Sequence, residues 1–432
     1  MRKYSFFLLL ISLSLCLSSC DVPGGGTAKE LPVKEAPVKE EPEPITIGAE
    51  NEPSTEEEEE KIVIPSAPEE EATPVEEVIP EEEEEESFEG YVLSEDDIPE
   101  NKVFLKSTAV PGETVMDFAG DINFDDRYAN MVSLRSRGGG LFDSIGSSLI
   151  NRTVSADIFM INNEFPYSSR GTPAPGKKFT FRAKPETVSF MQDLGADIVS
   201  LANNHAYDHG PDALLDTFDT LDGAGIPYVG AGHNLEEAMM PVYFIAGGMK
   251  ISFVSATQIE RSLPPDTKEA TETDPGVLRT LEPEKFLSVI RKAKETSDFC
   301  VAYVHWGSEG TNKYEQAQTE LAKAYEEAGA DLIMGDHPHV LQGITYINDT
   351  PVFYSLGNYW FNSKSLDTCL VEVVLSDGRI KSLQIIPATQ RSCVTKEAPK
   401  GSEDYNRILD NMRSWSTENV DIDEDGFIRQ KS

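Results

Sequence analysis

Short apolar runs that suit buried strands alternate along this chain with amphipathic stretches of helical period. The apolar runs fall at 114–120, 157–161, 196–202, 250–256, 299–305, 331–335 and 351–357, and the helical stretches at 185–195, 211–225, 283–294 and 314–330. Because strands and helices in alternation build a sheet of largely parallel strands, the pattern predicts an α/β domain. The later run 368–387 is typical of a β-hairpin, with Asp377 and Gly378 at its turn.

A segment of very different composition precedes this domain. Residues 21–100 hold 29 acidic and four basic side chains, and these account for most of the net charge of −39. Like charges this dense repel one another, and few large apolar groups are present to offset chain entropy. We therefore predict a disordered Glu/Pro-rich linker at 21–106, which acts as a solvating tether or, alternatively, binds calcium or basic polymers.

The folded domain is predicted at 112–392 and an acidic C-terminal tail at 393–432. Within the tail, DIDEDGFI at 421–428 has the spaced aspartates and the glycine that open a calcium-binding loop. Such a loop ends on glutamate at its twelfth position, which here is Ser432. The segment is therefore predicted to be an acidic turn.

Residues 1–20 have the features of a lipoprotein signal peptide. Two basic residues precede an apolar run too short to remain as a membrane span, and LSSC at 17–20 matches a bacterial lipobox. The sequence predicts export and lipidation of Cys20, which would make the protein a membrane-anchored lipoprotein of the cell envelope. The alternative is a plain signal peptide in which Cys20 has no role. The remaining cysteines leave open one disulfide bridge or buried free thiols: Cys300, Cys369 and Cys393.

Oxygen and imidazole ligands follow five of the predicted strands. They are Asp121, Glu164, Asn204 with its neighbour His205, His305, and the pair His337 and His339. Singly, each has an ordinary alternative as a turn cap, a solvated side chain or a core histidine. Together they favour a metal site, because α/β sheets place their sites at the carboxyl ends of strands. In an extended HPH segment, the two outer histidines would point the same way.

Mixed Asp, Glu, Asn and His ligands without thiolate suit manganese, zinc or iron. One or two such divalent ions would polarise a phosphoryl oxygen and provide hydroxide at neutral pH, which is the chemistry of a metal-dependent hydrolase. The sequence has no Gly-x-Ser-x-Gly turn and no phosphate-binding loop with Lys and Ser/Thr, which argues against serine hydrolases and nucleotide-driven enzymes. The acidic balance excludes nucleic acid as a partner.

In their order, several motifs resemble the CapA family of bacterial capsule synthesis proteins linked to poly-γ-glutamate. The matching segments are FAGDINF at 118–124, NNE at 162–164, FRAKP at 181–185, SLANNHAYDHG at 200–210, GAGHNLEEA at 230–238, HWGSE at 305–309, GADLIMGDHPHVLQG at 329–343 and YSLGNYWF at 354–361. The resemblance implies the calcineurin-like metallophosphoesterase fold, a β-sandwich flanked by helices.

The resemblance also implies a role for each ligand. Asp121 and His339 would bind a first ion, Glu164 would bridge, and Asn204, His305 and His337 would bind a second ion. His205 would be catalytic, facing the substrate and stabilising the transition state. Phosphoesterases of this fold usually begin with Asp-x-His, whereas this chain has Asn123 at the third position. That departure puts the first ion site in doubt.

Two functions and a non-catalytic role follow from these features. The first is a surface-anchored CapA-like protein that handles a polyanionic polymer such as poly-γ-glutamate, alongside capsule synthesis membrane proteins. The second is an exported metal-dependent phosphoesterase that acts on a phosphate ester, and the third is a polymer-binding module. The basic segment GKKFTFRAKP at 176–185 would bind an anionic substrate through Arg182 and Lys184, or would simply be an exposed loop.

Overall fold

The computed structural model describes residues 86–138, 140–259 and 267–431. The predicted signal peptide, its lipidation site Cys20 and most of the predicted linker lie outside the described residues. Among the described residues, no helix is long and apolar enough to cross a membrane.

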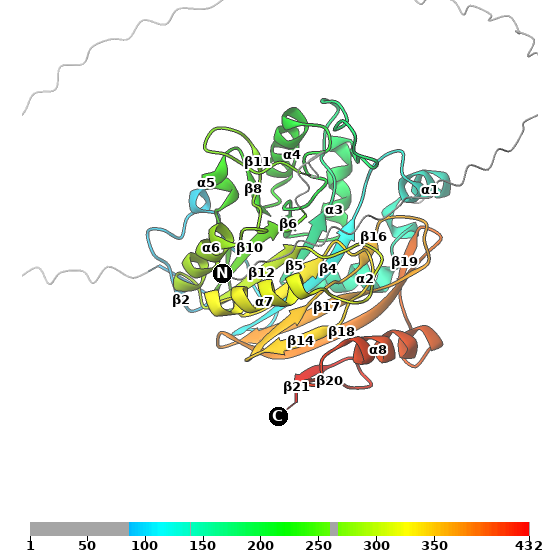
Figure 1. Cartoon of the computed structure of the whole chain (residues 1–432). Helices are drawn as coiled ribbons and strands as arrows, with labels where there is room; N and C mark the ends of the chain where they lie inside the picture. Colours follow the sequence, from blue (N-terminus) through cyan, green and yellow to red (C-terminus); the bar gives the residue numbers. More distant parts are fainter. Residues whose placement is uncertain (1–85, 139, 260–266, 432) are drawn as a thin grey trace, which may run out of the picture. The chain divides into compact units, whose positions relative to one another are not determined.

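Two large sheets form the framework (Figure 1). The first has the strand order β14 (Ile344–Ile347), β15 (Thr350–Phe353), β13 (Leu332–Asp336), β12 (Phe299–His305), β10 (Met249–Thr257), β9 (Val242–Ala246) and β3 (Val103–Leu105). The second has the order β19 (Val394–Glu397), β18 (Arg379–Arg391), β17 (Leu366–Ser376), β4 (Glu113–Ile122), β5 (Ile158–Asn163), β6 (Ile198–Ser200) and β7 (Tyr228–Val229), with β16 (Asn358–Trp360) beside β4. The neighbours β10, β12, β13 and β15 are parallel, as are β4 to β7.

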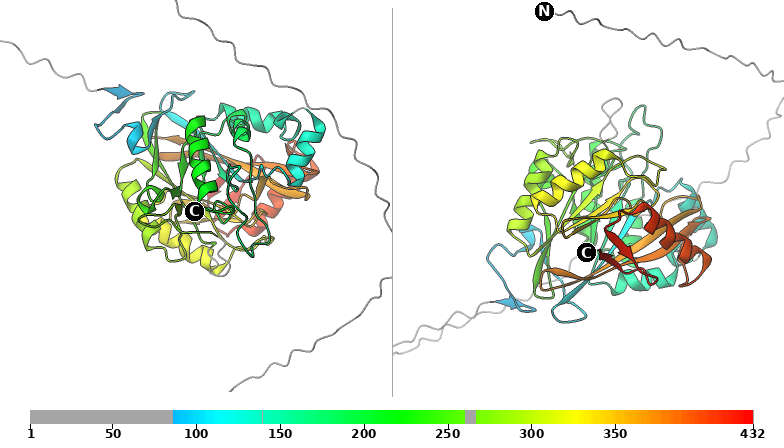
Figure 2. Two further views of the ribbon diagram at one scale, coloured as in Figure 1. Left: turned by 90° about the horizontal axis from the view of Figure 1, so that it is seen from above. Right: turned by 60° about the horizontal axis from the view of Figure 1, so that its bottom comes forward.

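The main core lies between the two sheets, because alternate residues of each strand point to opposite faces. On β5, Ile158 and Met160 face the core between the sheets, whereas Phe159 and Ile161 face the helices outside. Figure 2 shows helices on both outer faces. The second sheet is covered by α1 (Ala129–Arg137), α2 (Ser147–Ser155), α3 (Ser189–Asp193) and α4 (Pro211–Ala224), and the first by α6 (Glu284–Glu295) and α7 (Gln316–Ala328). The predicted α/β fold, a β-sandwich flanked by helices, is confirmed.

Short elements complete the described part of the chain. They are β1 (Ser87–Phe88), β2 (Tyr91–Val92), β8 (Ala231–Gly232), β11 (Gly276–Val277), β20 (Val420–Ile422), β21 (Ile428–Gln430), α5 (Leu235–Ala238), α8 (Glu403–Trp415) and the 3-10 helices η1 (Pro99–Asn101), η2 (Leu141–Asp143) and η3 (Pro185–Val188). The predicted hairpin is formed by β17 and β18, and both turn residues, Asp377 and Gly378, have the positive φ that such turns favour.

The domain extends beyond both predicted boundaries. Strand β3 lies within the predicted linker, and it pairs with β9. The predicted acidic tail at 393–432 contains β19, α8, β20 and β21, and α8 packs on β18. Tyr405, Ile408, Leu409 and Met412 form the buried stripe of α8, at the spacing of one helix face. The acidic composition of residues 393–432 as a whole does not reveal this stripe of apolar residues, which is why the segment was predicted to be a tail.

The acidic segment 421–428 contains the predicted turn, at 423–427. It joins β20 to β21, and Oδ1 of Asp423 accepts hydrogen bonds from the backbone N–H groups of Asp425 and Phe427, each at 2.9 Å. The cysteines of the body, Cys300, Cys369 and Cys393, are buried free thiols in the described structure.

Candidate metal centre

The predicted ligands meet where the carboxyl ends of parallel strands from both sheets lie at one edge. Asp121 is the last residue but one of β4, Glu164 directly follows β5, and His305 ends β12. Asn204 and His205 occupy the loop after β6, and His337 and His339 the loop after β13. Three overlapping groups of these side chains have ligand atoms within 4.8 Å of one another: Glu164, His305 and His337; Asp121, His305 and Asp336; and Asp121, Glu164 and His339. Such a buried cluster could hold a metal ion.

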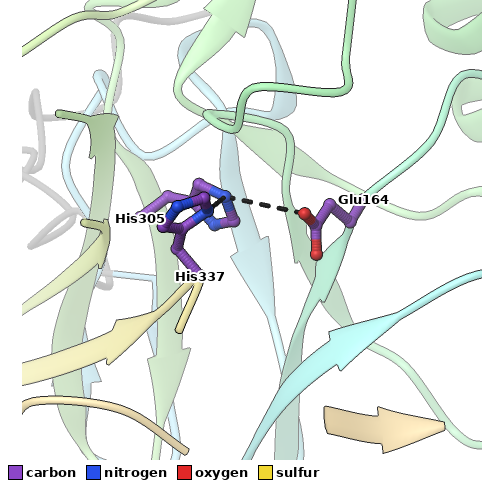
Figure 3. Close-up of side chains that lie close together, drawn as sticks. All are labelled: Glu164, His305 and His337. Carbon is purple, nitrogen blue, oxygen red and sulfur yellow. Dashed lines mark hydrogen bonds and ion pairs between the residues drawn. The ribbon is translucent and has the colours of Figure 1, made fainter. Parts of the chain in front are cut away.

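Glu164 lies at the middle of this cluster and has no hydrogen-bond donor among the described residues. Both of its carboxylate oxygens are fully buried, and neither accepts a hydrogen bond from that part of the chain. Its Oε1 is 3.7 Å from Nε2 of His305 and 3.8 Å from Nε2 of both His205 and His339. Figure 3 shows the carboxylate facing the imidazoles of His305 and His337.

The electrostatics of Glu164 also fit a cation. Burial, followed by the nearby carboxylates of Asp121 and Asp336, raises the pKa of Glu164 well above its ordinary value. An orphaned buried carboxylate is costly unless a positive charge offsets it. The ring nitrogens of His305 and His339, at 3.7–3.8 Å from Oε1 of Glu164, are too distant to donate hydrogen bonds, but they suit ligands that share an ion at about 2.0–2.2 Å from each. The residues therefore fit a divalent metal.

His305 gathers the ligands predicted for the second ion. Its Nε2 is 2.7 Å from Oδ1 of Asn204 and 3.0 Å from Nδ1 of His337. Its Nδ1 is 2.8 Å from Oδ1 of Asp336, which fixes the orientation of the ring. Burial lowers the pKa of His305 to about 3. Burial, and then His305 beside it, lowers the pKa of His337 well below its ordinary value. Both rings are thus neutral, which is the form that ligates metals.

His339 and Asp121 form the other side of the cluster. Nδ1 of His339 is 2.9 Å from Oδ2 of Asp121 and 2.9 Å from Oδ1 of Asn358. Asn162 donates to Oδ1 of Asp121 at 2.9 Å. Burial opposes the charges of this ion pair, but Asp121 raises the pKa of His339 and His339 holds the pKa of Asp121 well below its usual range. The pair is therefore ionised.

The HPH segment is not extended, contrary to expectation. His337 and His339 have φ values of +92° and +58°, in the left-handed region that non-glycine residues rarely adopt. The strand β13 ends at Asp336, so the chain must turn to bring both rings back over the strand ends. Strain of this kind persists only where the surrounding structure holds it, and it is concentrated at functional sites.

His205 faces the cluster from the loop after β6. Its Nδ1 is 2.6 Å from Oδ2 of Asp208, and its Nε2 points toward Glu164. Asp208 is held in turn by Nζ of Lys177 at 2.6 Å and by the backbone N–H of Phe181 at 2.6 Å. Burial raises the pKa of Asp208 to about 7, although Lys177 opposes the rise.

Three residues singled out from the sequence lie apart from the ligand set. Oδ1 of Asn123 accepts a hydrogen bond from the backbone N–H of Asp125 at 2.7 Å, so its oxygen stabilises a turn rather than facing an ion. Lys184 is exposed and pairs with Asp126 at 3.2 Å. Arg182 donates to a backbone carbonyl, that of Arg170, at 3.0 Å. Sequence reasoning missed Asp336, Asp208 and Asn358.

Residues 115–363 match the family of the bacterial capsule synthesis protein PGA_cap. The chain belongs to this family. It is 29% identical over 327 residues to the PGA biosynthesis protein CapA of Bacillus subtilis, which covers 73% of this chain and 84% of that protein. It is 36% identical over 218 residues to the capsule biosynthesis protein CapA of Bacillus anthracis, covering 49% of this chain and only 52% of that protein. The predicted CapA resemblance is confirmed.

Among solved structures, the crystal structure of TT1561 of Thermus thermophilus is similar at 11% identity with a TM-score of 0.36, covering 63% of this chain and 97% of that chain. A score this low carries no weight, and the fold assignment rests on the observed sheet order and helix layers.

Proposed function

We propose that this PGA_cap protein acts in the biosynthesis of a capsule-type polymer such as poly-γ-glutamate, as a metal-dependent hydrolase anchored at the cell surface. Family membership and the CapA relatives support the polymer. The observation that carries the metal-dependent reaction is Glu164, whose buried carboxylate has no donor among the described residues and is surrounded by three imidazole nitrogens.

Each predicted ligand has a place in this proposal. Asp121, His339 and Glu164 would hold one divalent ion, and Glu164, Asn204, His305 and His337 a second; manganese, zinc or iron suits both sets. Such ions supply Lewis-acid activation of water and of the scissile group when bound. The ligand set itself contains no serine or cysteine that could act as a nucleophile instead.

His205 is the proposed general acid–base. Asp208 holds its Nδ1, which leaves Nε2 on the side of Glu164 where the scissile bond would lie. A proton on Nε2 would pass to the leaving group, and the imidazolium before transfer would be stabilised by Asp208. Asp336 would position the ring of His305 rather than contact the substrate, because its Oδ1 is 2.8 Å from Nδ1 of His305.

An exported phosphoesterase is the second candidate, because an oxygen and imidazole ligand set without thiolate suits a phosphate ester as well as a γ-glutamyl bond. Both candidates use the same centre. They differ only in the product that is released.

Two substitutions test the centre. Glu164→Gln and His337→Asn keep the side-chain size but remove a charge or a ring ligand. Glu237→Gln and His233→Asn are matched controls, because these residues pair with each other at 2.7 Å outside the cluster. Elemental analysis would measure metal content, and parallel assays would follow cleavage of γ-glutamyl polymer and release of phosphate from p-nitrophenyl phosphate.

We expect metal content and hydrolysis to fall together in the two site variants and to be unchanged in the controls. Full metal content in both site variants would rule out the centre. Polymer cleavage supports the first candidate, and phosphate release supports the second. A metal-loaded wild-type protein that hydrolyses neither compound would instead be a binding module.

A further inference from the structure

Two of the four basic side chains in the segment predicted to bind substrate pair with carboxylates of the protein itself. Lys177 is buried, and its Nζ pairs with Asp208 and contacts the backbone carbonyl of Asn204. Lys184 pairs with Asp126. Lys177 and Lys184 therefore serve mainly to hold loops in place, whereas Lys178 is exposed, with its Nζ 4.9 Å from the ring centroid of Phe179.

Arg182 differs, because its guanidinium pairs with no carboxylate of the described residues. Nη1 donates to the backbone carbonyls of Arg170 at 3.0 Å and Gly171 at 3.5 Å. These neutral acceptors fix the direction of the side chain without cancelling its charge. The remaining N–H groups of the guanidinium are available for an anion.

A second arginine lies beside it. Asp125 is buried, and its Oδ2 accepts the backbone N–H of Arg182 at 2.8 Å and Nη2 of Arg127 at 3.1 Å. One carboxylate thus joins two loops that are far apart in the sequence. It balances one of the two guanidinium charges, and the Arg127 side chain stays 66% exposed. The pair keeps a net positive charge on an otherwise acidic protein.

The chain segment that carries Arg182 lies next to the metal centre. Phe181, the residue before Arg182, has its ring centroid 4.3 Å from that of His205 and 5.4 Å from that of Phe361. Phe361 in turn lies 4.6 Å from His339. Arg182 therefore directly follows in the sequence an aromatic residue, Phe181, that contacts His205 and, through Phe361, is linked to His339.

A buried histidine, His209, lies near both arginines. Neither ring nitrogen of His209, which is 2% exposed, has a hydrogen-bond partner in the described structure. Burial, and then the Arg182 guanidinium, lowers the pKa of His209, and Arg127 acts in the same direction, whereas Asp208 and Asp125 oppose the fall. The histidine is thus neutral and does not add to the charge of the pair.

We propose that Arg127 and Arg182 form an anion-binding subsite, which holds a carboxylate or phosphate of the substrate chain next to the group that reacts at the metal centre. The planar guanidinium suits both anions, since it donates two parallel hydrogen bonds to either. This subsite rests on the proposed function and narrows it to substrates with a repeated negative charge.

Arg182→Gln in the full chain tests the subsite, because the change leaves the carboxylate pairs of Asp125 and Asp126 intact. Arg137→Gln is the matched control: its guanidinium also donates to backbone carbonyls, those of Ser392 and Cys393, and pairs with no carboxylate of the described residues. Fluorescence anisotropy at low salt would measure binding of two labelled probes, a short oligo-γ-glutamate and a short glycerol-phosphate oligomer. Thermal melts would establish that each variant is folded.

We expect Arg182→Gln to weaken binding by about fivefold, as for one partly exposed charged contact, and Arg137→Gln to leave it unchanged. If Arg182→Gln weakens binding of the oligo-γ-glutamate alone, the subsite is assigned to carboxylates. If it weakens binding of the phosphate oligomer alone, the subsite is assigned to phosphates. Weaker binding of both probes assigns the subsite to anions in general. Unchanged binding of both probes, equal losses in the control, or no binding by the wild type would overturn the subsite. Because the readout is binding, failure of hydrolysis at the metal centre leaves the result interpretable.

Discussion

A buried carboxyl on β4, outside the metal centre, is predicted to make stability fall as pH rises. Asp117 is 1% exposed, and neither of its oxygens has a hydrogen-bond partner in the described structure. Burial, and then Glu372 opposite it on β17, raises its pKa from 3.8 to about 8, although Arg152 opposes the rise. The folded protein therefore keeps a proton on Asp117 that the unfolded chain has already lost at neutral pH.

The sign follows from proton binding. Below about pH 4 the carboxyl is protonated in both states and its full contribution to stability is present. Between pH 4 and pH 8 only the folded state holds the proton, so the free energy of unfolding falls by about 1.4 kcal/mol per pH unit. From pH 5 to pH 7 the loss is at most about 2.7 kcal/mol. Asp117→Asn has the same shape and cannot ionise, so it avoids this loss.

Urea unfolding followed by tryptophan fluorescence, in buffer with a chelator so that metal binding does not contribute, would measure the difference. We expect the stability of Asp117→Asn relative to wild type to rise by up to about 2.7 kcal/mol between pH 5 and pH 7. Asp157→Asn is the control, since Asp157 is also buried but accepts backbone hydrogen bonds from Ala109 at 3.0 Å and Val115 at 2.8 Å. That variant should be less stable than wild type. Parallel pH profiles for wild type and Asp117→Asn would refute the reasoning.

Three further predictions concern packing, metal affinity and anchoring. Gly335→Ala would place a methyl group 2.3 Å from Nε1 of Trp306, so it should lower the free energy of unfolding by about 2 kcal/mol or more. Gly223→Ala has open space around the new methyl group and should leave the free energy of unfolding unchanged. Urea unfolding of both variants measures the difference. Asp336→Asn should weaken metal binding about 10- to 100-fold, measured by metal titration, because it releases the imidazole it orients; unchanged affinity would contradict this role. Cys20→Ser should move the protein from the membrane fraction to the soluble fraction and abolish fatty-acid labelling in cells; persistence in the membrane fraction would exclude the lipid anchor.

The ligand cluster could be predicted from the sequence for a geometric reason. Residues at the carboxyl ends of parallel strands come to one edge of a sheet whatever the length of the intervening helices, so a polar residue after each apolar run is a usable signal. Asp121, Glu164 and His305 follow that rule. The same rule applies across the two sheets, because they face each other and the ends of β12 and β13 meet those of β4 and β5.

Residues that support the ligands were harder to find. Asp336 immediately precedes His337 in the sequence, but it orients His305, 31 positions away, which depends on the register between β12 and β13. Asp208 had a local signal, since it lies three residues after the histidine it orients. The left-handed backbone conformation at His337 had no such signal in the sequence, because the position is not occupied by glycine or asparagine.

The charge of the cluster links the proposed metal to the proposed anionic substrate. Two imidazoles, His305 and His337, are neutral, and the charge of His339 balances only Asp121. Any ionisation of Glu164 then adds uncompensated negative charge to an acidic protein, which would repel a polyanion entering the site. A divalent cation at Glu164 reverses the sign of that potential and favours the ionised carboxylate. In the proposed function, metal binding would therefore be a condition for holding an anionic chain at the reacting position, and the net charge of the arginine pair would act in the same direction on the neighbouring anionic group.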